Sequence, residues 1–112
     1  MPVTQLLDLY EPTHPQERCG LITKGGKLVE IDNIHDTPEL GYRMDPKQVL
    51  AHLDDAIATW HTHPDSDPNL SQEDYAGFSQ WPRLKHYIVG MRNGAPDVDI
   101  FEIQEGMLIK CD

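Results

Sequence analysis

A pair of histidines two positions apart constrains the fold of this chain more than any other feature. Residues 59–64 read TWHTHP and follow an apolar run. If this segment is a strand, its two-residue period places His61 and His63 on one face. Asp74 lies eleven positions after His63, in a segment that Ser71 opens as a helix. The chain can therefore fold back from the strand and bring a carboxylate to the histidine pair.

Turn and cap signals divide the rest of the sequence into short elements. Asp45-Pro46 is a helix start, Gly25-Gly26 between two apolar runs predicts a hairpin, and Pro82 ends a helix. The polar segment 33–42 predicts a loop. Helices are expected at residues 2–10, 46–55 and 71–80. Strands are expected at residues 19–23, 28–31, 56–63, 86–91, 98–103 and 107–110.

This order of elements predicts one mixed α/β domain over residues 1–112, in which a single β-sheet is flanked by helices. The length is within the commonest domain size of roughly 100–150 residues. Trp60 alternates with the histidines along the strand, so we expect it to pack in the core. We expect Tyr75 and Phe78 to face the core from the third helix.

The composition excludes several classes of partner. Nine basic and nineteen acidic residues give a net charge of −10, which would repel nucleic acid and favour a basic partner. The two cysteines lie outside any CxxC pair, which argues against a disulfide framework. No apolar run reaches the roughly 18–20 residues of a membrane span, and no signal-peptide pattern opens the chain. We therefore expect a cytoplasmic protein without a membrane partner.

The histidine pair and the carboxylate match the chemistry of a catalytic zinc site. Such a site uses three protein ligands and keeps a fourth position for water, whose pKa the metal lowers to about 7. His61, His63 and Asp74 would supply that set for one Zn²⁺ ion. Each residue also has an ordinary explanation: a histidine at a strand end is often only hydrogen-bonded, and Ser71 with Asp74 matches a helix capping box. The capping and metal-binding interpretations are compatible.

The ordered pattern of Glu17, then HTHP at residues 61–64 and SQED at residues 71–74, resembles the JAMM motif of the JAB/MPN (Mov34/MPN/PAD-1) metallopeptidase family. The family motif reads E, then H-[ST]-H-P, six residues and S-x-x-D, and residues 65–70 give that gap. Residues 15–21, PQERCGL, are also similar to the segment around the family's glutamate. The resemblance extends over about residues 3–104.

This resemblance implies a JAB/MPN fold with cytidine-deaminase-like layering. It implies that His61, His63 and Asp74 bind zinc. Glu17 would be the general base and Ser71 would stabilise the oxyanion during hydrolysis of an amide or isopeptide bond. The substrate would be a protein or peptide, for example a ubiquitin-like protein. The compact form most resembles JAB domains of phage tail-assembly proteins, which would place the chain in a host cytoplasm.

Two other interpretations remain open. The chain could be a non-catalytic MPN-like scaffold that binds a partner through its sheet edge or groove. The segment 61–65, HTHPD, also resembles the start of the metallo-β-lactamase motif H-x-H-x-D-H, but residue 66 is Ser and 112 residues are too few for that fold. The remaining histidines lack ligand-like spacing, and we expect them in loops, on the surface or packed inside: His14, His35, His52 and His86.

Overall fold

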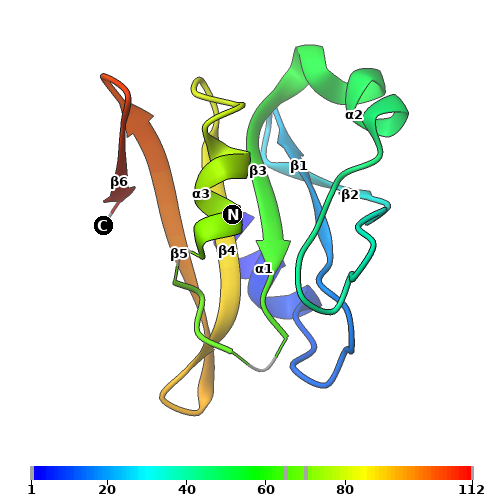
Figure 1. Cartoon of the computed structure of the whole chain (residues 1–112), viewed down its shortest axis with the longest axis vertical. Coiled ribbons are helices and arrows are strands. Elements are labelled where there is room, and N and C mark those ends of the chain that lie inside the picture. Colours follow the sequence, from blue (N-terminus) through cyan, green and yellow to red (C-terminus); the bar gives the residue numbers. More distant parts are fainter. Residues whose placement is uncertain (1, 65, 70, 112) are drawn as a thin grey trace.

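The chain folds around a mixed β-sheet with the strand order β2-β1-β3-β4-β5-β6 (Figure 1). The computed structural model describes residues 2–64, 66–69 and 71–111. Within these residues the strands are β1 (Cys19–Thr23), β2 (Lys27–Ile31), β3 (Ala56–Thr62), β4 (Lys85–Arg92), β5 (Ala95–Gln104) and β6 (Met107–Cys111). The helical elements are α1 (Pro2–Leu9), α2 (Pro46–His52), the 3₁₀ turn η1 (Leu53–Asp55) and α3 (Gln72–Phe78). The predicted single mixed sheet flanked by helices is confirmed.

Strands β3 and β4 form a parallel pair at the centre of the sheet, and their neighbours pair with them in antiparallel fashion. A parallel pair needs a crossover connection, and here the crossover contains α3. In Figure 1 this helix lies in front of β4, beside the lower end of β3. The topology therefore carries the segment after the two histidines across the face of the sheet on which His61 lies.

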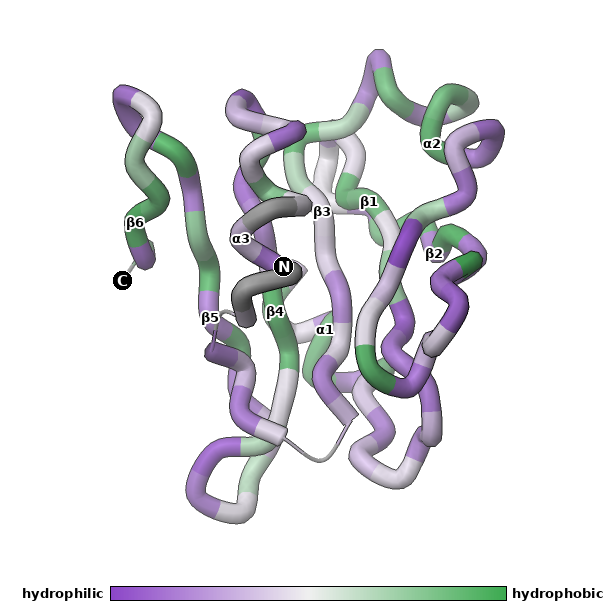
Figure 2. The backbone as a smooth tube through the Cα atoms, in the orientation of Figure 1, coloured by the Kyte–Doolittle hydropathy of each residue, from purple (hydrophilic) through white to green (hydrophobic). Residues whose placement is uncertain are grey.

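The two faces of the sheet are covered by different helices. On one face, α1 contributes Leu6 to a buried cluster with Ile22, Ala58 and Trp60, as predicted for Trp60. On the other face, α2 packs Val49 against β1 and β2, and α3 packs Phe78 against β4 and β5. Figure 2 shows a hydrophobic stretch in the middle of β4 and the hydrophilic turn between β4 and β5.

One prediction about α3 is wrong. Phe78 is buried as expected, but Tyr75 is 50% exposed. The buried stripe of this helix passes through Asp74 and Phe78, which are four residues apart and therefore lie above one another on the helix surface. Tyr75 is rotated away from that stripe. The inward-facing side chain in the first turn of α3 is the Asp74 carboxylate, and a pattern of apolar residues alone could not indicate this.

The helix boundaries follow their local signals. Asp45 caps α2, and its carboxylate accepts a hydrogen bond from the Lys47 N–H at 2.9 Å, with Pro46 in the first turn. The regular helix ends at His52, and the predicted remainder to residue 55 is the 3₁₀ turn. Within the described part of the chain, no helix combines the length and the apolar character that crossing a membrane would require.

Candidate metal centre

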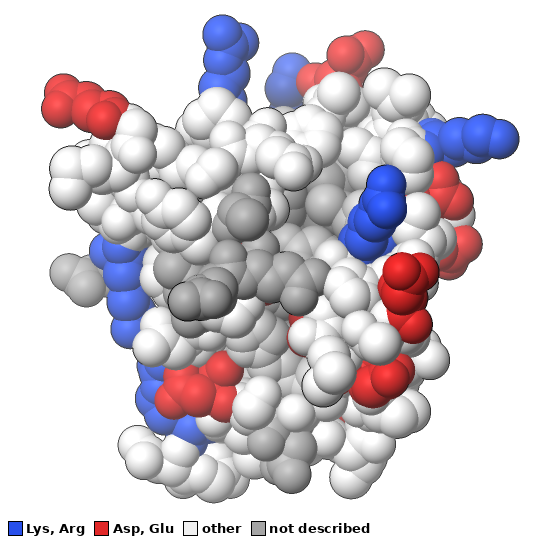
Figure 3. Space-filling model, viewed as in Figure 1, with Lys and Arg blue, Asp and Glu red and all other residues white. Residues whose placement is uncertain are grey.

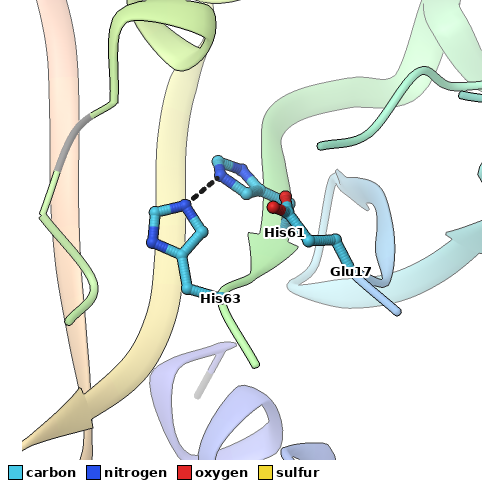
Figure 4. A group of neighbouring side chains, drawn as sticks. All are labelled: Glu17, His61 and His63. Carbon is cyan, nitrogen blue, oxygen red and sulfur yellow. Dashed lines mark hydrogen bonds between the residues drawn. The ribbon is translucent and has the colours of Figure 1, made fainter. Parts of the chain in front are cut away.

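The C-terminal end of β3 brings the two predicted histidines together. The His61 side chain is completely buried, and His63 follows the last residue of the strand. The His63 N–H donates to the Val89 carbonyl at 2.8 Å, so the backbone stays against β4 beyond the end of the strand. The Nε2 atoms of the two imidazoles lie 3.2 Å apart (Figure 4). The two-residue spacing of His61 and His63 therefore brings their imidazoles together, as predicted.

Asp74 lies between the two imidazoles. Its Oδ1 is 3.0 Å from Nε2 of His61 and its Oδ2 is 3.0 Å from Nε2 of His63. The carboxylate is placed by a capping box, in which the Asp74 N–H donates to Ser71 Oγ at 3.0 Å and the Ser71 N–H donates to Asp74 Oδ2 at 3.1 Å. Ser71 thus caps the helix while Asp74 faces the histidines, as the compatible interpretation predicted.

Glu17 joins the cluster from the segment before β1. One ligand atom each from Glu17, His61 and His63 lies within 4.8 Å of the other two. The register explains this approach, because Cys19 of β1 pairs with His61 of β3. The Glu17 N–H also donates to the Pro38 carbonyl at 2.8 Å. Figure 4 shows the carboxylate of Glu17 directed toward the imidazoles.

The buried charges of the cluster determine its protonation. Burial alone would raise the pKa of Asp74, but the hydrogen bonds and charges of His61 and His63 outweigh it and hold that pKa well below its usual range. Burial would lower the pKa of His63, yet the Asp74 carboxylate and the Asp67 carbonyl raise it overall. Asp74 is therefore ionised at neutral pH.

The donor set fits a zinc ion. Ligand atoms on a tetrahedral Zn²⁺ with bonds of about 2.0–2.1 Å lie about 3.3 Å from one another, and the separations between these imidazoles and the carboxylate are 3.0 to 3.2 Å. Nδ1 of His63 donates to the Asp67 carbonyl at 2.8 Å. Because a carbonyl only accepts, this bond places a proton on Nδ1, and the ring presents Nε2 to Asp74 and His61.

Two tyrosines that the sequence did not single out support the cluster. The Tyr42 ring stacks on His61, with centroids 4.2 Å apart, and the Tyr10 hydroxyl donates to the His63 carbonyl at 2.7 Å. Tyr42 comes from a polar loop and Tyr10 follows α1, so both contacts depend on long-range packing. No local pattern in the sequence indicates either of them.

Tyr42, which stacks on His61, also lines a groove. It has a volume of about 750 Å³ and lies between the 34–44 segment, α2 and the C-terminal end of α3. Its wall includes Trp81, together with Leu50, which is 71% exposed. Figure 3 shows that charged side chains lie mostly around the rim of this face of the molecule.

The other four histidines of the chain lie apart from the cluster, as expected. His14 and His35 are partly exposed in loops, and His52 is exposed at the end of α2. His86 is buried: its Nδ1 lies 2.7 Å from the Thr59 hydroxyl and its Nε2 3.2 Å from the Trp81 carbonyl. The acidic position of the metallo-β-lactamase alternative, residue 65, lies outside the described residues.

Comparison with known proteins identifies one relative by sequence and two by fold. A desampylase of Haloferax volcanii is 31% identical over 87 residues, which cover 66% of this chain and 62% of the desampylase. A protein of Desulfitobacterium hafniense, solved in solution, has the same fold, with a TM-score of 0.71 and 20% identity over 97% of this chain and 84% of its own. A protein of Salinibacter ruber gives a TM-score of 0.56 and 20% identity over 96% of this chain and 86% of its own.

Residues 3–103 match the family described as prokaryotic homologs of the JAB domain. The matched region contains the histidine pair, Asp74, Glu17, strands β1 to β4 and all of β5 except its last residue. The resemblance inferred from the motif is thereby confirmed at the level of the family. This chain belongs to the prokaryotic JAB family.

Proposed function

We propose that this chain is a zinc-dependent hydrolase of amide or isopeptide bonds. The observation that carries the proposal is the position of the Asp74 carboxylate, 3.0 Å from Nε2 of both His61 and His63, with Glu17 beside them. Two imidazoles and one carboxylate form a three-ligand set, which is typical of catalytic rather than structural zinc. A second, separate carboxylate is the group that hydrolysis needs for proton transfer.

In the proposed mechanism His61, His63 and Asp74 would hold the metal. When bound, zinc would polarise the scissile carbonyl and lower the pKa of water. The Glu17 carboxylate accepts a proton from the attacking water and returns it to the nitrogen of the leaving amine. The Ser71 hydroxyl accepts from the Asp74 N–H, which leaves its own proton free to donate to the carbonyl oxygen as negative charge develops.

The proposed substrate is a protein of the ubiquitin-like kind. The similarity to a desampylase supports this class, and the groove lined by Tyr42 offers a place for part of a polypeptide. With apolar walls at Trp81 and Leu50, the groove suits an apolar stretch of chain. A role in phage tail assembly and a location in the cytoplasm stay predictions.

Metal analysis and one substitution test the proposal. The purified protein should contain zinc at close to one ion per chain, and Glu17→Gln should keep that zinc while losing hydrolysis of a ubiquitin-like conjugate. The exposed Glu11→Gln is the matched control and should retain full activity. Full activity in Glu17→Gln would reject the assigned base. Absence of zinc would instead favour the non-catalytic scaffold.

A further inference from the structure

The loop formed by residues 66–69, which follows the histidines, lies closely against the end of β4. The Met91 N–H donates to the Ser66 carbonyl at 2.7 Å. A side chain at position 90 would not fit, because a Cβ on Gly90 would lie 2.3 Å from the Ser66 carbonyl oxygen and 2.8 Å from the Pro68 nitrogen. The glycine therefore permits a backbone-to-backbone approach at this point.

Asp67 links this loop to two partners. Its carbonyl accepts the proton of His63 Nδ1 at 2.8 Å, while its side-chain Oδ1 accepts from the Asn69 N–H at 2.8 Å and from Arg92 Nη2 at 3.1 Å. The backbone of Asp67 thus orients a proposed zinc ligand. Its side chain is held by a guanidinium from the end of β4.

Arg92 is itself held by a buried carboxylate. Asp99 on β5 is only 3% exposed and accepts from both Nη1 and Nη2 of Arg92, at 2.9 and 2.7 Å. A buried carboxylate requires such pairing, and the two parallel bonds fix the plane of the guanidinium. Asp97 accepts from Nη1 at 3.1 Å, and the Lys110 ammonium is 3.3 Å from Asp99. The guanidinium is therefore a fixed point on the sheet.

We propose that Arg92 is a positioning residue for the metal centre. It joins the buried Asp99 to Asp67, so that the Asp67 carbonyl remains in place to accept the Nδ1 proton of His63. This bond keeps the His63 ring oriented with Nε2 toward Asp74 and His61. The inference rests on the proposed function only in taking His63 as a zinc ligand. Groups that orient a ligating histidine in this way typically change metal affinity by about 10- to 100-fold.

Two substitutions should break the connection from opposite ends. Arg92→Met removes the guanidinium, and Asp67→Ala removes the carboxylate while leaving the Arg92–Asp99 pair intact. Each should weaken Zn²⁺ binding by about tenfold, measured by competition with a chelator. Each should also speed the solvent exchange of the His63 Nδ1 proton, observed by ¹⁵N NMR. Asp67→Asn should stay close to the parent protein, because its amide oxygen can still accept both bonds.

Lys110→Met is the matched control, since Lys110 pairs with the same buried Asp99 but makes no described contact with the loop. It should change neither zinc affinity nor the exchange of the Nδ1 proton. If it weakens zinc binding as much as Arg92→Met does, the effect belongs to the Asp99 charge and positioning by Arg92 is rejected.

Unchanged exchange and affinity in Asp67→Ala would also overturn the inference, and this variant decides the matter if Arg92→Met fails to fold. The exchange measurement on metal-free protein separates the two proposals. Should the parent chain bind no zinc, the proposed function fails, while faster Nδ1 exchange in Asp67→Ala would still support the positioning role.

Discussion

The two faces of β3 differ in what they contribute. Ala58 and Trp60 point toward α1 and are buried among apolar side chains. Thr59 and His61 alternate with them, point toward α3 and are equally buried, but among polar partners. One seven-residue strand therefore supplies both a hydrophobic core and a candidate metal centre. We infer that apolar packing on the α1 face contributes most of the stability of this strand, whereas the α3 face carries the candidate metal centre.

The α3 face can hold buried polar groups because they pair with one another. The Thr59 hydroxyl is 2.7 Å from His86 Nδ1, and His61 is 3.0 Å from Asp74. Phe78 lies among these groups: its ring stacks on His86 with centroids 4.1 Å apart and is tilted against His61 at 5.9 Å. Unpaired polar groups in such a place would each cost roughly 1–3 kcal/mol. Changes on the two faces should therefore have different consequences.

The largest effect on stability is expected on the α1 face. Trp60→Ala should lower the free energy of unfolding by about 3–5 kcal/mol, because it leaves a cavity in the cluster with Leu6 and Ile22. Urea denaturation measures this change, with the exposed Met107→Ala as a control expected within about 0.5 kcal/mol. The zinc affinity of the molecules that remain folded should be unchanged. A similar loss in both variants would contradict the assignment of Trp60 to the core.

A pH-dependent effect of slightly smaller size is expected from His86. Burial lowers the pKa of His86 from 6.5 to about 4, so the folded protein keeps this imidazole neutral. The unfolded chain takes up the proton first as the pH falls, and stability that is fully present above pH 6.5 is lost toward pH 4. The loss due to this residue should be about 3 kcal/mol.

Urea unfolding of the metal-free protein between pH 7 and pH 4 tests this. His86→Leu should be less stable at pH 7, because Thr59 loses its partner, but its stability should fall less steeply with decreasing pH. The Asp74 cluster is present in both proteins, so its own titration largely cancels in the comparison. Parallel pH profiles for the two proteins would contradict a neutral buried His86.

Zinc bound on the α3 face should raise the free energy of unfolding of the protein by a comparable amount. At a free zinc concentration of about 100 times the dissociation constant, the free energy of unfolding should rise by about 2.7 kcal/mol. Asp74→Asn removes the carboxylate that bridges both imidazoles, so the same zinc concentration should stabilise this variant by less than about half as much. Thermal unfolding with and without zinc measures the difference. Equal stabilisation of Asp74→Asn and the exposed Asp54→Asn would remove Asp74 from the ligand set.

Local patterns predicted the parts of this site that lie close together in the sequence. Strand alternation placed His61 and His63 together, and the capping box placed Asp74 in the first turn of α3. Each of these follows from the geometry of a single element. The same is true of the hairpin between β1 and β2 and of the start of α2.

The contacts that the sequence could not indicate depend on strand pairing. Glu17 meets the histidines only because β1 pairs with β3, and without the family resemblance it was an ordinary glutamate at a strand entrance. The contacts of Tyr42 and Arg92 were not indicated by the sequence either. Tyr42 comes from a loop with no periodic pattern, and Arg92 contacts Asp67 across 25 positions. Tyr75 was misplaced because the inward-facing side chain that determines the helix face is a carboxylate.

The smallest effect on stability, and the most specific one for function, is expected in the groove. Leu50 is 71% exposed, so Leu50→Ser should change the free energy of unfolding by no more than about 0.5 kcal/mol, and zinc affinity should be unchanged. If the groove receives an apolar stretch of a ubiquitin-like substrate, kcat/KM for that conjugate should fall roughly fivefold, mainly through KM. This is the size expected from losing about 1 kcal/mol of apolar contact. Ile57→Ser, a 45% exposed position outside the groove, is the control, and an equal fall in both variants would place the substrate elsewhere on the surface.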